Sequence, residues 1–298
     1  LEDIVMNFDI IHIYGLWQPF LMKVFFAARK YNKKIVFSPL GALEPWAYEQ
    51  KKLKKKIAFY LYQKKILQKA DSILCTSDEE MQNIKLLGIN NKMNVIPHGV
   101  YLQNPKKFHF MKKKKKAIFF SRIHSKKGLL ELVNTWQKIN PENWTLDIYG
   151  PVSDENYLKK VEKMIIDYEL TKKIKIFKPI FDKEKKLNLL MGSDCFILPS
   201  KSENFGISIA EALSCSLPVV TTFQTPWKII QEKNAGIVFN FEGKRGNENL
   251  MITLKNLFSL TDEQMKQMGE NARKIISEKF DHNLITEKYI KFYKSLVV

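Results

Sequence analysis

The chain has 298 residues, of which 45% are hydrophobic and 27% are charged. This composition excludes a disordered or fibrous protein and leaves room for two domains with separate cores. The formal net charge is +18, from 49 Lys and Arg against 31 Asp and Glu. Such an excess favours anionic partners, among them nucleic acid, lipid head groups and phosphorylated substrates. No apolar run is long enough to span a membrane, and no signal peptide is visible.

The three cysteines lie far apart in apolar runs, at Cys75, Cys195 and Cys215. Their spacing fits neither a zinc site nor a disulfide framework. We therefore expect reduced thiols in a reducing compartment.

The first hundred residues alternate between short apolar runs and longer amphipathic stretches. Such alternation is typical of a parallel sheet covered by helices. We expect strands at 9–14, 34–38, 72–76 and 93–96, and helices at 20–31, 45–70 and 78–87.

The expected helix at 45–70 is basic and amphipathic. Its lysines, from Lys51 to Lys69, alternate with apolar residues such as Leu53 and Leu61. A basic amphipathic helix binds an anionic membrane surface, or it forms the solvated outer layer of a sheet domain. We favour membrane contact slightly and keep both interpretations.

A second alternation begins at Ala117, after a charge run at Lys112–Lys116 that we expect to be solvated linker. It predicts a second parallel sheet of the same kind. The expected strands are 117–121, 145–149, 174–177, 195–198 and 236–239, together with one that starts at 219. The expected helices are 129–139, 157–170, 182–191, 247–258, 261–278 and 283–296, together with one that opens at 206.

The stretch Asp194–Thr222 is the clearest candidate for a ligand site. It reads as a buried strand, a polar loop, a helix opened by Gly206 and another strand. Parallel sheets bind ligands at such loops, and a helix start suits a phosphate. On an ideal helix, Glu203 and Glu211 would differ by roughly 80° and about 12 Å, so both would face one elongated ligand. The alternative is a generic strand–helix unit with two surface glutamates.

The run Glu203-Asn204-Phe205-Gly206 through Glu211-Ala212, with Leu217-Pro218-Val219-Val220 after it, resembles the Glu-x7-Glu motif of retaining family 4 glycosyltransferases. These are group 1 glycosyl transferases of GT-B fold. The resemblance implies that Glu203 lies beside the donor sugar, together with the amides of Asn204, Phe205 and Gly206. It implies that Glu211 binds the ribose hydroxyls. Ser216 stands where relatives favour Gly, at a small cost if its φ stays negative.

The segment Arg122 to Gly128 resembles the family's Gly-Arg-Leu-x-x-x-Lys-Gly segment. The resemblance implies that Arg122 and Lys127 bind the donor diphosphate. Cations fixed there would stabilise the negative charge that grows as the sugar–phosphate bond breaks. The alternative is two ordinary surface cations. Gly150 ends a strand where the base or ribose often lies.

No Asp-x-Asp metal motif is present, and the cation pair can do the electrostatic work of a divalent ion. We therefore expect a metal-independent reaction without a cofactor.

The segments around His12 and Leu40 resemble the second half of the family's N-terminal domain. The chain opens with Leu, and we expect it to lack the first strand–helix units of that domain. His12 and Gly15 are candidates for the acceptor or donor-sugar side, although His12 fits a packed, hydrogen-bonded histidine equally well. Leu40 stands where many relatives have His, which removes one expected contact.

The resemblance implies an α/β protein of GT-B architecture, with two Rossmann-like domains facing a cleft. We expect a partial N-terminal domain at 1–103, a nucleotide-sugar-binding domain at 104–280, and a helix at 281–298 that crosses back to the first domain.

The implied function is transfer of a sugar from a nucleotide-diphospho-sugar to a glycan or lipid-linked acceptor. The implied setting is synthesis of a cell-envelope polysaccharide such as lipopolysaccharide, in the cytoplasm or at the inner face of the membrane. One alternative is a truncated, inactive relative that only binds nucleotide sugar. The other is a basic nucleic-acid-binding protein, which we do not expect because no recognisable module is present.

Overall fold

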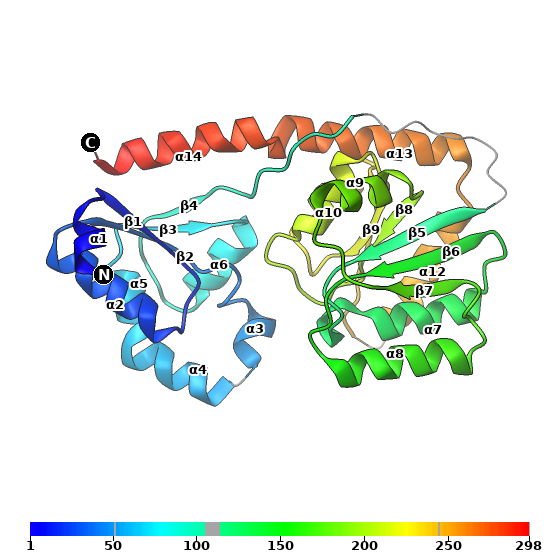
Figure 1. Cartoon of the computed structure of the whole chain (residues 1–298), viewed down its shortest axis with the longest axis horizontal. Helices are drawn as coiled ribbons and strands as arrows, with labels where there is room; N and C mark the ends of the chain where they lie inside the picture. The colour runs from blue at the N-terminus through cyan, green and yellow to red at the C-terminus, as the bar shows by residue number, and fades with distance from the viewer. Residues whose placement is uncertain (51, 105–113, 244, 298) are drawn as a thin grey trace. The chain divides into compact units, whose positions relative to one another are not determined.

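The computed structural model describes residues 1–50, 52–104, 114–243 and 245–297 (Figure 1). The chain forms two compact units. Unit 1 comprises Leu1–Gly99 together with Asn283–Val298, and unit 2 comprises Val100–His282. Each unit is built around one parallel sheet, which confirms the predicted α/β class. The three cysteines are buried thiols.

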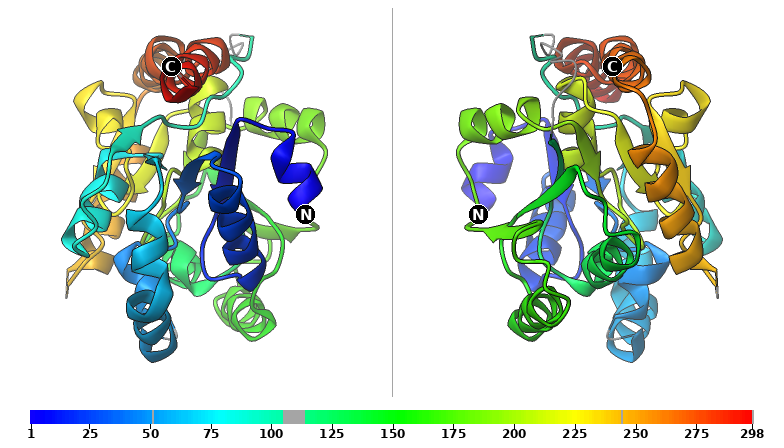
Figure 2. Two further views of the ribbon diagram at one scale, coloured as in Figure 1. Left: turned by 90° about the vertical axis from the view of Figure 1, so that its left-hand side faces the viewer. Right: turned by 90° about the vertical axis from the view of Figure 1, so that its right-hand side faces the viewer.

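Unit 1 contains a four-stranded parallel sheet in the order β1-β2-β3-β4. Helices α1 and α2 lie side by side next to it (Figure 2). The strands are β1 (Ile10–Tyr14), β2 (Lys34–Ser38), β3 (Ser72–Cys75) and β4 (Met93–Val95), and the helices are α1 (Glu2–Met6), α2 (Pro19–Lys30) and α6 (Asp78–Leu86).

The two faces of this sheet bury different clusters, because side chains alternate along a strand. Ile35 and Phe37 of β2 pack in one cluster with residues of α1 and α2. Val36, between them, belongs to a second cluster, which is completed by the last helix, α14 (His282–Val297). The C-terminal segment therefore supplies part of the core of unit 1.

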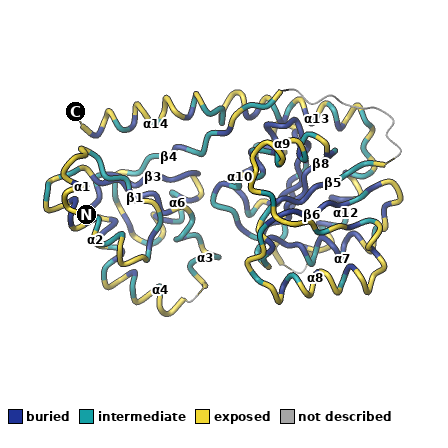
Figure 3. The backbone as a smooth tube through the Cα atoms, viewed as in Figure 1, coloured by how far each residue is buried: buried dark blue, intermediate teal, exposed yellow. Residues whose placement is uncertain are grey.

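The prediction of one continuous helix at 45–70 is wrong. The chain instead forms α3 (Pro45–Glu49), α4 (Lys52–Ala58), a π-helical turn η1 (Phe59–Gln63) and α5 (Lys64–Gln68). Gln50, at the end of α3, has ψ 119°, an extended value that redirects the backbone. Lys51 lies outside the described residues. The outer side of α4 is exposed, whereas β3, inside the sheet of unit 1, is buried along its length (Figure 3).

Unit 2 contains six parallel strands in the order β10-β9-β8-β5-β6-β7. Along the chain, β5, β6 and β7 are added towards one edge of the sheet, and β8, β9 and β10 towards the other edge. The sheet therefore has a topological switch point between β5 and β8. The strands are β5 (Lys115–Phe120), β6 (Trp144–Tyr149), β7 (Ile174–Phe177), β8 (Cys195–Ile197), β9 (Val219–Thr222) and β10 (Gly236–Phe239).

The helices of unit 2 follow the predicted alternation, with the additional short helix α11. They are η2 (Ser125–Lys127, 3₁₀), α7 (Leu129–Ile139), α8 (Glu155–Asp167), α9 (Lys183–Met191), α10 (Ile207–Ser214), α11 (Ile229–Glu232), α12 (Gly246–Phe258), α13 (Asp262–Ile275) and η3 (Ile276–Phe280, π).

The predicted solvated linker at Lys112–Lys116 is wrong at its end, because Lys115 and Lys116 are the first residues of β5. Lys115 pairs with Asp262 at 2.7 Å and Lys116 with Asp147 at 3.0 Å. These ion pairs allow charged residues to begin a strand. Residues 112 and 113 lie outside the described residues.

Ser216 has φ 59°, so the negative φ under which we expected only a small cost is not met. Helix α10 ends in a Schellman motif. The Leu217 N–H donates to the Ala212 carbonyl at 3.1 Å and the Ser216 N–H to the Leu213 carbonyl at 3.0 Å. This motif needs a left-handed residue at position 216, where Gly avoids the strain that a Cβ introduces.

We predict that Ser216→Gly raises the free energy of unfolding by up to about 1 kcal/mol, because relief of left-handed strain outweighs the greater freedom of Gly in the unfolded chain. Urea denaturation followed by tryptophan fluorescence measures the change. Ser216→Ala is the matched control, since it keeps the strained Cβ and gains nothing. A Gly variant no more stable than the Ala variant would contradict the assignment.

Candidate functional site

Two loops of unit 2 meet at the switch point, one after β5 and one after β8. The Lys201 N–H donates to the Lys126 carbonyl at 2.8 Å. Gly128 has φ +69°, and a Cβ at this position would lie 2.2 Å from the Pro199 carbonyl oxygen. The approach of the two loops therefore requires glycine at position 128 for both space and conformation.

This approach brings Lys127 and Glu203 together. The Nζ atom of Lys127 lies 2.5 Å from Oε1 of Glu203, and the two side chains are 6% and 11% exposed. Such a buried pair is held strongly, because removing one partner leaves the other charge uncompensated. An ammonium group has three N–H donors, so Lys127 retains donors for an anionic ligand.

Arg122 lies on the same loop as Lys127 but is exposed. Within the described ranges its side chain has no recorded hydrogen bond or ion pair with the other predicted site residues, although its backbone packs against Gly150. Its neighbour Ile123 donates its N–H to the Pro151 carbonyl at 2.9 Å. Gly150 permits this packing, since a Cβ there would lie 1.8 Å from the Ser121 carbonyl oxygen.

The helical spacing predicted for Glu203 and Glu211 does not apply, because α10 begins at Ile207 and Glu203 lies in the loop before it. Gly206 is the N-cap of α10, with φ +79°. The first N–H groups of a helix lack intrahelical acceptors, so this helix start suits an anion.

Phe205 and Asn204, between the two glutamates, have different environments. Phe205 is buried against Trp227, with ring centroids 5.2 Å apart, and its carbonyl accepts a hydrogen bond from the Trp227 indole. The Oδ1 atom of Asn204 is buried without a hydrogen-bond partner among the described residues. A buried acceptor without a partner is costly and suits a ligand hydroxyl.

Glu211 forms an ion pair with Lys186 of α9. Sequence analysis did not identify Lys186 as a site residue. It lies in the basic helix before β8, and nothing in its local pattern separates it from the many other lysines.

Of the two candidates in unit 1, His12 is the middle residue of β1 and not its end, and Gly15 directly follows the strand. His12 contacts the Tyr293 hydroxyl through Nδ1 at 2.6 Å and the Ser38 hydroxyl through Nε2 at 2.8 Å, and its ring stacks on Tyr14. These are the contacts of a packed histidine. Gly15 has φ +85° and donates its N–H to the Ser38 carbonyl at 2.8 Å. Leu40 is exposed.

Burial lowers the pKa of His12 to about 4 from an ordinary value of 6.5. The fold therefore holds the neutral imidazole, and the stability that it contributes is present above pH 6.5 and lost as the pH falls from 6.5 towards 4. We predict that a histidine NMR titration will show one ring titrating near pH 4. His12→Gln should remove that resonance. A His12 pKa near 6.5 would refute the prediction.

The residues of unit 2 can therefore bind an anion beside a polyol. A buried ammonium and a helix start lie next to a carboxylate and a buried amide oxygen. Among the described residues, no group of three or more His, Cys, Asp and Glu side chains is placed to hold a metal ion. No described helix is both long and apolar enough to cross a membrane.

Two family models match the chain. The model described as "Glycosyl transferases group 1" matches residues 102–275, and the model described as "Glycosyltransferase Family 4" matches residues 2–104. Among curated proteins, an uncharacterized 41.2 kDa protein in the cps region of Klebsiella pneumoniae is 25% identical over 97% of this chain and 79% of its own length.

Solved structures share the fold over nearly the whole chain. Anabaena HepE in complex with UDP and glucose superposes with a TM-score of 0.82 at 18% identity, over 99% of this chain and 80% of its own. Sucrose-phosphate synthase from Thermosynechococcus elongatus has a TM-score of 0.78 at 18% identity, over 98% of this chain and 74% of its own. These similarities confirm the expected GT-B fold.

Proposed function

The chain belongs to the glycosyl transferases group 1 family, and on that premise we propose that it is a retaining glycosyltransferase. It transfers a sugar from a nucleotide-diphospho-sugar to a glycan or lipid-linked acceptor. The observation that carries the proposal is the Lys127–Glu203 pair at the switch point of unit 2. Anabaena HepE has also been solved in complex with UDP-glucose, which supports a nucleotide sugar as donor.

In the proposed reaction, Arg122 and Lys127 bind the diphosphate. The bond between the anomeric carbon and the phosphate oxygen breaks, and its electron pair passes to that oxygen. The two cations stabilise the charge that develops there. The acceptor hydroxyl attacks on the face from which the diphosphate leaves, so the sugar keeps its configuration, and the hydroxyl proton passes to the departing oxygen.

The carboxylates position the two ends of the donor. Glu203, oriented by Lys127, lies beside the sugar, together with Asn204 and the N–H groups at the start of α10. Glu211, oriented by Lys186, binds the ribose hydroxyls. No step requires a metal ion, because the lysine and arginine supply the positive charge.

We expect the reaction to serve cell-envelope polysaccharide synthesis on the cytoplasmic side of the membrane. The similarity to a protein in the cps region supports this setting. A relative that binds donor without turnover is the alternative, and the experiment below distinguishes the two.

A thermal-shift panel of nucleotide sugars identifies the donor, because a ligand of the folded state raises stability. With that donor, we predict that Lys127→Ala lowers the transfer rate by about 100-fold, which is typical for loss of one charge-stabilising group. Arg122→Ala is expected to act in the same direction and has no folding cost, because Arg122 is exposed.

Lys159→Ala, on the exposed side of α8, is the control for loss of a cation and should leave the rate unchanged. Transfer by Lys127→Ala or Glu203→Ala at the wild-type rate would refute the roles. Donor binding without hydrolysis or transfer would favour the inactive relative.

Membrane contact is part of the proposal, and the surface of α4 and η1 supports it. Leu53 and Leu61 are 72% and 69% exposed, and Ile57 and Tyr60 are also exposed. Their spacing places them on one side of a helix, with Lys52 and Lys56 beside them. We name these six residues the α4 surface. An apolar stripe flanked by lysines suits an anionic lipid surface.

We predict that the chain sediments with phosphatidylglycerol vesicles but not with phosphatidylcholine vesicles. Leu53→Ser/Leu61→Ser should reduce the bound fraction several-fold, because both side chains would insert among the acyl chains. Leu86→Ser, on α6, is the control, since this leucine is 84% exposed, more than either Leu53 or Leu61. Equal binding by both variants would exclude the α4 surface as the contact.

A further inference from the structure

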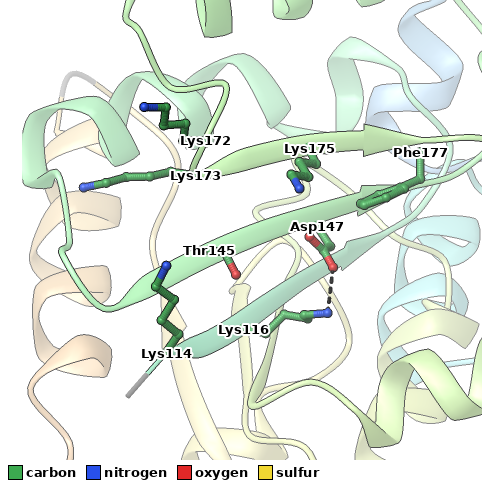
Figure 4. A pocket seen from close by; sticks show the side chains of 8 residues that line it. All are labelled: Lys114, Lys116, Thr145, Asp147, Lys172, Lys173, Lys175 and Phe177. Atoms are coloured by element: carbon green, nitrogen blue, oxygen red, sulfur yellow. Dashed lines mark ion pairs between the residues drawn. The ribbon is translucent and has the colours of Figure 1, made fainter. Parts of the chain in front are cut away.

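Unit 2 contains a cavity of about 330 Å³ above β5, β6 and β7 (Figure 4). None of its lining residues belongs to the loops that carry Lys127 and Glu203. The cavity has five lysines against one aspartate, so its charge is strongly positive. Its lining consists of Lys114, Lys116, Thr145, Asp147, Lys172, Lys173, Lys175 and Phe177.

The strand register assembles this cavity on one face of the sheet. Trp144 packs on Phe258 of α12, with ring centroids 4.9 Å apart. Because side chains alternate along β6, Thr145 and Asp147 point to the opposite face. On β7, Lys175 pairs in register with Asp147. An acidic, a basic and a hydroxyl side chain therefore lie together on the same face.

Asp147 forms the polar floor of the cavity. Its side chain is 10% exposed, and Oδ2 accepts from Lys116 at 3.0 Å. Its other oxygen, Oδ1, has no recorded partner in the part of the chain that the structure describes. The lysine orients the carboxylate, and the second oxygen can accept a hydrogen bond from a ligand hydroxyl.

The lysines around this floor differ in whether their amines already bind other atoms of the protein. Lys173 donates to Oδ1 of Asn140 at 2.6 Å and to the Pro141 carbonyl at 3.0 Å, so its amine is directed to the protein. Lys175 is exposed and has no ion pair recorded with a described residue. Lys175 and Lys116 are therefore the cations best placed for a ligand acid group.

The aromatic ring of Phe177 forms part of the cavity wall. Phe177 is 37% exposed and stacks on Tyr149 at 4.7 Å, with 7° between the ring planes. Tyr149 stacks in turn on Phe120 at 5.8 Å. Because Tyr149 stacks against one face of Phe177, the orientation of Phe177 is fixed. Its ring then offers apolar surface to a ligand ring.

We propose that this cavity binds one acidic sugar unit of the glycan acceptor or product, namely a monosaccharide that carries a carboxylate or phosphate group. The inference rests on the proposed function and adds a substrate class to it. Lys175 and Lys116 bind the acid group, Asp147 accepts a sugar hydroxyl, and Phe177 packs on the ring. The volume lies at the low end of small-ligand sites, which suits a single unit.

Single-stranded nucleic acid is the competing ligand class for a basic surface with aromatic residues. It requires a groove that follows the backbone and several aromatic platforms for successive bases. Among the lining residues of this compact cavity, Phe177 is the single aromatic side chain. The geometry therefore favours the acidic sugar.

The test is an NMR titration with UDP present at saturation, so that the nucleotide site is occupied. The probes are methyl glucuronoside, glucose 1-phosphate, neutral methyl glucoside and inorganic phosphate. We expect the two acidic sugars to bind more tightly than the other two. Lys175→Gln should weaken their binding about tenfold, and Phe177→Leu should weaken it several-fold. Lys159→Gln is the control and should have no effect.

Equal binding of glucoside and glucuronoside, or of inorganic phosphate and glucose 1-phosphate, would overturn the inference. So would unchanged affinity in Lys175→Gln, or tighter binding of a single-stranded RNA oligonucleotide that displaces the sugars. Thermal stabilisation by nucleotide sugars is measured in parallel. If nucleotide sugars stabilise the chain but acidic sugars do not bind, this inference is wrong and the proposed function stands. If nucleotide sugars do not stabilise the chain, the result counts against the proposed function.

Discussion

The close approach of two loops at the switch point of unit 2 is the constraint on which the candidate site depends. Gly128 lies against the Pro199 carbonyl, where a side chain has no room. Because the loops pack this closely, Lys127 is withdrawn from water and must have a carboxylate as its partner. The cost of burying either charge alone makes the contact obligatory. The packing of two backbone segments thus determines where the cation and the carboxylate lie.

A second ion pair repeats this arrangement at α10. Glu211 is oriented by Lys186, a residue of α9, just as Glu203 is oriented by Lys127. Each carboxylate of the motif is therefore held by a lysine from a different element. A carboxylate whose rotamer is already restricted loses less entropy when it binds a sugar hydroxyl, which is the general benefit of preorganisation. Arg122 differs from these residues. It is exposed, and its side chain has no ion-pair partner among the residues that the structure describes.

Much of the fold follows from hydrophobic alternation. The strands at 34–38 and 236–239 and the helix at 129–139 match their predicted bounds, because buried parallel strands are short apolar runs between polar turns. Each error has an identifiable physical cause. The extended Gln50 ends a helix whose composition favours continuation, and Lys115 enters a strand because Asp262, distant in sequence, neutralises it.

For the candidate site, the sequence predicted several residues but not the contacts between them. Lys127 and Glu203 were recognised from motifs, and the structure adds that they touch. Lys186 could not be found, because its partner lies on another helix and local spacing carries no information about it. The left-handed Ser216 was missed for a similar reason, since its φ is set by the Schellman hydrogen bonds that end α10.

The contribution of α14 to unit 1 has a consequence for biosynthesis. The ribosome makes residues 1–99 first, yet Val36, Leu74 and Ile96 await Phe292 and Leu296 for their cover. Unit 2 is translated in full before that cover emerges. The first sheet therefore keeps one apolar face open to solvent until α14 has been synthesised, and this face is a binding surface for chaperones during that interval.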